Sequence, residues 1–162
     1  MLGRVFFSEK TQRLLALVLA AIAFTQWGYL WYATIFDDVW QTLIGRTEDD
    51  LISMAMARGY SQTLLTYLIS AVQAGGLYII LRMSRAKTFM EYQFIAAILS
   101  IMIALPVLGN EVLFAGSPTE LWVLDFMHFI LGYAGMALIF FIASHFKIAN
   151  LIQSYGIKSK LN

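Results

Sequence analysis

Four long apolar runs take up more than half of this chain and constrain its fold more than any other feature. They cover residues 14–36, 60–81, 89–109 and 121–146. Each is close to or longer than the roughly 20 residues that cross the hydrocarbon core of a bilayer as a helix. Because backbone polar groups in lipid must be bonded within the protein, such runs predict transmembrane helices. We therefore expect an all-α polytopic membrane protein, an antiparallel bundle of four transmembrane helices that forms one domain over residues 1–162.

Composition agrees with this class and excludes several chemistries. Hydrophobic residues make up 60% of the chain and charged residues only 13%, whereas soluble domains carry about 25% charged residues. The chain has no cysteine, which excludes disulfides, iron–sulfur clusters and thiol catalysis. It also lacks a glycine-rich phosphate loop, a serine nucleophile motif and a basic aromatic strip, so nucleotide hydrolysis, serine catalysis and nucleic-acid binding have no support.

The distribution of charge predicts a topology. Most of the eleven Lys and Arg residues lie in the N-terminal arm, the second connection and the C-terminal tail, whereas most acidic residues lie in the first and third connections. Basic residues near span ends mark the cytoplasmic side, so we expect both termini to be cytoplasmic. The first run continues well past the small residues Ala21 to Ala23, which argues against a cleaved signal peptide. We expect a multi-pass protein of a bacterial inner membrane.

Segments outside the four runs are also expected to be helical. Apolar rows continue past Phe36 at helical spacing and stop at Gly45, and Thr47 can cap a second helix that begins with acidic residues. This pattern predicts that helix 1 runs on into an outer helical hairpin over 37–58; the alternative is a separate short helix over 37–44 that lies flat on the membrane. Val5-Phe6-Phe7 and an amphipathic tail over 147–162 are expected to rest on the lipid bilayer or to contact a partner.

Polar residues inside the fourth run give the candidate site. Asp125 and His128 lie one helical turn apart, and charged groups in lipid are rare and often functional. Depth along the helices places Glu111 and Asn110 near the same level. We expect these residues to converge just under the outer surface, near two aromatic residues of the first helix, Tyr32 and Trp31, which makes them the candidate ligand-binding residues.

Several roles remain open for this cluster. Two carboxylates and an imidazole are acceptable metal ligands, although none of the usual metal motifs is present. His128 could instead relay protons or act as a base oriented by Asp125. We favour a structural role, because an acid near a helix N-terminus interacts favourably with the helix dipole and a nearby histidine can be its hydrogen-bond partner. His128 and His145 lie too far apart on one helix to bind one haem iron, and we expect no metal and no cofactor.

Two amides lie near the middle of their spans. Gln26 and Gln73 are at similar depth, so an amide pair between the first and second helices is feasible, and we expect these amides to hold helices together.

The first hairpin resembles a known family. Trp31, Tyr32, Phe36 and Trp40, followed by Gly45 and an acidic helix start, are similar to the first-helix pattern of the bacterial membrane proteins grouped as domain of unknown function 1761. A polar residue opens the last helix of that pattern, as Asp125 does here. His128 is not part of the pattern, and Asp37 and Asp38 replace a pair that is often smaller and less acidic. The resemblance implies four helices over 14–146 and no assigned activity.

These observations favour a non-enzymatic membrane protein that acts through helix packing, as a homo-oligomer or as an accessory subunit of a membrane complex. The alternative is a small outward-facing protein that binds or transports a cation or an amine through Glu111, Asp125 and His128. A third hypothesis is a membrane enzyme that uses His128 as its general base. An open polar cavity around those three residues would favour binding or transport, whereas a cluster closed by internal hydrogen bonds would favour packing.

Overall fold

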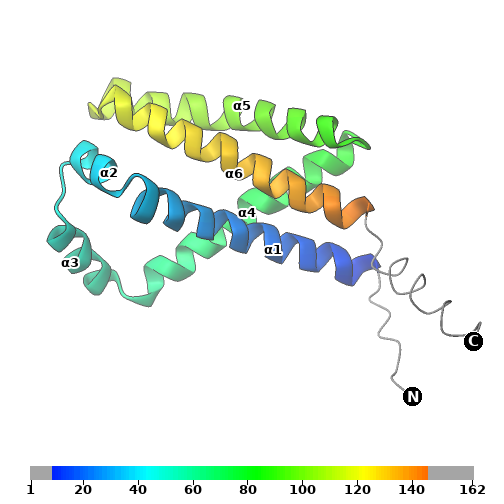
Figure 1. Ribbon diagram of the computed structural model, residues 1–162, viewed down its shortest axis with the longest axis horizontal. Helices are drawn as coiled ribbons and strands as arrows, with labels where there is room; N and C mark the ends of the chain where they lie inside the picture. Colours follow the sequence, from blue (N-terminus) through cyan, green and yellow to red (C-terminus); the bar gives the residue numbers. More distant parts are fainter. Residues whose placement is uncertain (1–8, 146–162) are drawn as a thin grey trace, which may run out of the picture.

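The computed structural model describes residues 9–145, which form helices and no strand (Figure 1). The elements are α1 (Glu9–Leu30), the π-helical turn η1 (Trp31–Ile35), α2 (Asp37–Ile44), α3 (Glu48–Arg58), α4 (Tyr60–Met83), α5 (Phe89–Ala115) and α6 (Thr119–His145). Four helices are long and apolar enough to span a membrane: Lys10–Ile35, Tyr60–Met83, Phe89–Ala115 and Thr119–His145. The all-α class with four candidate spans is therefore confirmed. Val5-Phe6-Phe7 and the tail over 147–162 lie outside the described residues.

The four long helices are not packed evenly. Antiparallel α5 and α6 lie side by side along most of their length, and α1 packs against both α6 and α4 (Figure 1). α4 crosses the other helices obliquely and makes few contacts with α5. α1 and α6 are therefore the central pair of the bundle, and α4 and α5 flank them.

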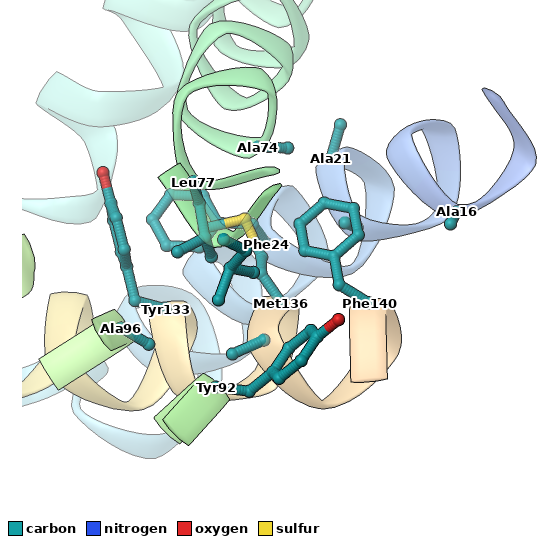
Figure 2. Packing of buried hydrophobic residues seen from close by; sticks show 13 residues of the cluster. Ala16, Ala21, Phe24, Ala74, Leu77, Tyr92, Ala96, Tyr133, Met136 and Phe140 are labelled. Atoms are coloured by element: carbon teal, nitrogen blue, oxygen red, sulfur yellow. The ribbon is translucent and has the colours of Figure 1, made fainter. Parts of the chain in front are cut away.

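Small residues allow the four long helices to approach closely. Ala20, Ala74, Ala96 and Ala137 are fully buried, and larger side chains such as Met136 fill the space between them (Figure 2). In a bilayer, where lipid tails are as apolar as leucine, close van der Waals packing of this kind holds helices together.

Hydrogen bonds between helices supplement this packing. Thr25 on α1 donates to Ser70 on α4 at 2.8 Å, and Gln93 on α5 donates to the carbonyl oxygen of Ala134 on α6 at 3.2 Å. Polar groups buried from water are stable only when they are bonded, so these pairs fix which helix faces meet.

An amide pair between Gln26 and Gln73 does not form. The Gln26 amide donates to the hydroxyl of Tyr67 at 2.8 Å, and Oε1 of Gln73 is buried without a hydrogen-bond partner. Equal depth was not sufficient for pairing, because α1 and α4 pack so that Tyr67 rather than Gln73 meets the Gln26 amide.

The first helix does not run unbroken to Gly45. After Leu30 it widens into η1, in which the amide of Phe36 donates to the carbonyl of Trp31 at 3.0 Å. Phe36 leaves the helical conformation, and α2 begins afresh at Asp37. The prediction of one continuous helix was wrong, and the bounds of the alternative short helix over 37–44 match the structure.

The hairpin has the expected capping residues. Gly45 ends α2 in the left-handed conformation at φ +64°, which favours glycine. Thr47 caps α3 in a reciprocal capping box: its hydroxyl accepts from the Asp50 amide, and the Asp50 carboxylate accepts from the Thr47 amide at 3.0 Å. This carboxylate lies outside the spans, and the hydrogen bond from the Thr47 backbone lowers the pKa of Asp50.

Candidate functional site

His128 is buried in a cluster of aromatic side chains between the two central helices. It lies on α6 and is 6% exposed. Its ring centroid is 5.4 Å from that of Phe24, 6.2 Å from that of Trp31 and 4.9 Å from that of Tyr32. The ring of Trp27 is stacked parallel to it at 6.4 Å. We call these five residues the His128 cluster.

The spacing of residues on α1 explains how this cluster forms. Phe24, Trp27, Gly28 and Trp31 recur at the three- and four-residue intervals that place side chains on one helix face. Gly28 lies against the imidazole, since a Cβ atom there would be in ordinary van der Waals contact with Nε2 of His128, at 3.5 Å. η1 then changes the helical register, and the next residue, Tyr32, also contacts His128.

Three side-chain nitrogens inside the cluster lack hydrogen-bond partners among the residues that the structure describes. Nδ1 and Nε2 of His128 are both buried and unpaired, and so is Nε1 of Trp31. An unpaired buried polar group costs about 1–3 kcal/mol, so such groups are uncommon in folded proteins and require an explanation. Three of them in one cluster mark the place where the fold leaves hydrogen-bonding capacity unused.

Asp125 lies one turn before His128 and borders the cluster. Its Oδ1 accepts a hydrogen bond from the hydroxyl of Tyr32 at 2.7 Å. The expected hydrogen bond between Asp125 and His128 is not formed, since both imidazole nitrogens are unpaired. No ion pair of Asp125 is present within the residues that the structure describes.

Glu111 is close enough to Asp125 for the two carboxylates to repel each other, but neither Glu111 nor Asn110 is hydrogen-bonded to this arrangement in the described part of the chain. Both are exposed near the end of α5. Residues 9–145 also contain no group of three His, Asp or Glu side chains placed to hold a metal ion. Of the predicted ligand-binding residues, the structure brings together Asp125, His128, Tyr32 and Trp31.

Phe24, Trp27 and Gly28 are the residues of this site that the sequence analysis did not assign to it. The signal was present, because all three share the face of α1 that carries Trp31. Their proximity to His128 depends on how α1 and α6 cross, which spacing within one helix does not reveal.

The cluster is closed in this structure. An apolar groove of about 280 Å³ lies beside it between α1 and α6, and Phe24, Trp27 and Gly132 are among its lining residues. A second cavity lies at the other end of the bundle. Neither is lined by Glu111, Asp125 or His128. A molecule reaches His128 only when one of the surrounding rings moves.

Comparison with known proteins gives one match. The family model described as "Protein of unknown function (DUF1761)" matches residues 15–141, which include all of the His128 cluster and Asp125. No curated protein and no solved structure matches the chain.

Proposed function

We propose a function for this chain, which belongs to the DUF1761 family of proteins of unknown function. In this proposal the protein is a non-enzymatic membrane protein that binds a small organic amine between α1 and α6, beside His128. The observation that carries the proposal is the half-buried Asp125, a carboxylate inside a candidate span whose partner is a tyrosine hydroxyl, with no cationic partner among residues 9–145. Ionisable residues in spans usually pair with one another or mark a ligand pathway.

The chemistry of the surrounding groups suits an amine. A protonated amine donates hydrogen bonds to the Asp125 carboxylate and to the unprotonated nitrogen of His128 at the same time. The faces of Trp27, Trp31 and Tyr32 stabilise a cation through their ring quadrupoles, more strongly where water is excluded. The site therefore consists of Asp125 and the His128 cluster, without Glu111 and Asn110.

η1 provides a route for opening the site. π-helical turns are rare and often occur at functional sites. This one carries Trp31 and Tyr32, two of the rings that cover His128, and the non-helical Phe36 follows it directly. A shift of η1 toward regular α-helix would rotate these rings away from His128 and admit a ligand.

Binding of benzylamine tests this proposal, with benzyl alcohol as its uncharged counterpart of similar size. We expect benzylamine to quench tryptophan fluorescence saturably and to raise the melting temperature of the protein in detergent, while benzyl alcohol has little effect. Asp125→Asn should abolish the response, and Asp38→Asn, which removes an exposed carboxylate of α2, should retain it. Equal responses to the two compounds, or an unchanged response of Asp125→Asn, would refute amine binding.

A homo-oligomer is the second candidate, favoured by the exposed face of α4. Gly75 and Gly76 lie in the middle of this helix, and a Cβ atom on either would meet nothing within 4 Å. They share a face with Val72, which is 69% exposed. Glycines on an exposed apolar face allow a second helix to approach closely. The partner in this candidate is a second copy of the chain or another membrane protein.

Disulfide crosslinking tests this candidate without background, because the natural chain has no cysteine. A symmetric dimer through α4 should give a covalent dimer of Gly76→Cys in membranes, whereas Met102→Cys on α5 should remain monomeric. Equal crosslinking of the two variants, or a monomer by native mass spectrometry in mild detergent, would argue against the dimer.

The proposed location is a bacterial inner membrane with both termini in the cytoplasm. The support is the excess of Lys and Arg at the end of the bundle where α1 begins and α4 joins α5. Cysteine labelling of intact cells tests it. A membrane-impermeant maleimide should label Arg46→Cys and should not label Arg85→Cys. The reverse pattern would show the opposite orientation.

A further inference from the structure

A cavity of about 230 Å³ with both polar and apolar lining residues lies at the end of the bundle opposite the α2–α3 hairpin. All four long helices contribute to it. Its polar lining consists of Gln12, Arg13, Tyr78, Arg82, Tyr92 and Ser144. Its apolar lining includes Ala16 and Phe140, which lie with Tyr92 at one end of the buried cluster in Figure 2.

The charge of this cavity is positive. Arg13 comes from the first turns of α1 and Arg82 from the last turn of α4, and none of the described lining residues is acidic. The planar fork of arginine matches the oxygens of a phosphate in a bidentate arrangement.

The position of the cavity indicates which kind of phosphate-bearing molecule it can bind. It lies where the candidate spans begin or end, which is the level of lipid headgroups around a spanning bundle. Large apolar side chains next to it are exposed, with Leu14 at 62% and Met83 at 76%. Acyl chains can cover these side chains while a headgroup occupies the cavity. Basic pockets between transmembrane helices are known to bind anionic headgroups.

We propose that this cavity binds the phosphate group of an anionic membrane phospholipid, held by Arg13 and Arg82. Tyr78 and Gln12 provide further hydrogen-bond donors along the same wall. The bound lipid joins the start of α1 to the end of α4, two elements far apart in the sequence. This proposal is independent of the amine site, which lies at the other end of α1.

The experiment compares lipid retention by native mass spectrometry in nanodiscs of phosphatidylcholine with a minor fraction of phosphatidylglycerol. Arg13→Gln with Arg82→Gln removes the two cavity charges. Lys10→Gln with Lys87→Gln removes two charges from the same end of the bundle without touching the cavity, and so controls for surface attraction. We expect the arginine pair to lose phosphatidylglycerol about tenfold more than the lysine pair, the loss expected for one charge-assisted hydrogen bond.

Two further measurements distinguish a lipid site from a site for a free anion and from a failure of the variant to fold. Inorganic phosphate is titrated against the lipid; if millimolar phosphate displaces it, the site is one for a free anion and the lipid proposal is overturned. Equal losses in the two double variants would also overturn it. If the glutamine pair fails to fold, Arg13→Lys with Arg82→Lys decides, because it keeps both charges and removes the forks. A weakened preference for phosphatidylglycerol supports the site, and an unchanged preference overturns it.

Discussion

The indole of Trp27 donates a hydrogen bond to the backbone carbonyl of His128 at 3.1 Å, and the two rings lie parallel within 3°. This carbonyl belongs to α6 and the indole to α1, so one side chain both bonds to the other helix and stacks on its histidine. The orientation of His128 is thus set from its backbone and from its ring face. Its two nitrogens take no part in either contact.

Replacing this histidine by an apolar ring should stabilise the protein. His128→Phe keeps an aromatic ring in the cluster and removes two unpaired buried nitrogens, which we expect to raise stability by about 1–3 kcal/mol. Thermal unfolding in detergent without added amine measures the effect. His145→Phe is the control: it removes an exposed imidazole that is hydrogen-bonded to Ser144 and should not stabilise. A lower melting temperature for His128→Phe would show that the nitrogens have partners in solution.

The closest approach of α1 and α6 should tolerate no side chain at Gly132. A Cβ atom there would lie 2.7 Å from Cδ2 of Phe24 and 3.1 Å from Cδ1 of Trp27. Both rings are held by the packing of the cluster, so we expect Gly132→Ala to destabilise by about 1–3 kcal/mol, the usual cost of overpacking a core. Gly135→Ala on the same helix meets nothing within 4 Å and should be neutral or stabilising. Equal melting temperatures for the two variants would contradict this packing.

The sequence predicted the helices better than it predicted their partners. Apolar runs set the four spans because hydrocarbon thickness fixes how many residues a span needs. Gly45 and Thr47 were equally predictable, since the left-handed conformation and the capping box depend on neighbouring residues only. η1 was not predictable, because its hydrogen bonds compete closely with those of an α-helix and the packing of Trp31 against Phe36 and His128 decides between them.

The candidate site was predicted only in part, because the sequence identifies polar residues within a span but not the groups that they contact. Asp125 and His128 can be identified from the sequence because they are polar residues inside an apolar run. Their spacing places them on the same face of the helix. Which groups they meet depends on the crossing of two helices. Tyr32 rather than His128 therefore bonds to Asp125, and Glu111 remains exposed at the end of α5.

The α3 capping box should open in acid. Hydrogen bonds from Thr47 lower the pKa of Asp50 in the folded state. A group with a lowered folded pKa stabilises the fold above its unfolded pKa, near 3.9 for an aspartate, and this contribution is lost as the pH falls through the folded value. We expect hydrogen exchange at the amides of residues 47–50, corrected for the intrinsic rate, to accelerate at about pH 3 relative to about pH 6. Asp50→Asn should show weak protection at both pH values.

A double-mutant cycle on Tyr32 and Asp125 tests the bond that joins η1 to α6. Tyr32→Phe removes the hydroxyl that donates to Oδ1 at 2.7 Å and leaves a half-buried carboxylate without a partner. Asp125→Leu removes that carboxylate, and the double variant removes both groups. Because coupling energies between polar pairs in membrane helices average about 0.6 kcal/mol and reach about 1.7 kcal/mol, we expect a coupling in the upper part of this range for a charged acceptor. Unfolding free energies of the four proteins in mixed micelles give the coupling directly. Additive effects would mean that the two side chains do not interact, and the position of Asp125 beside the His128 cluster would then need another explanation.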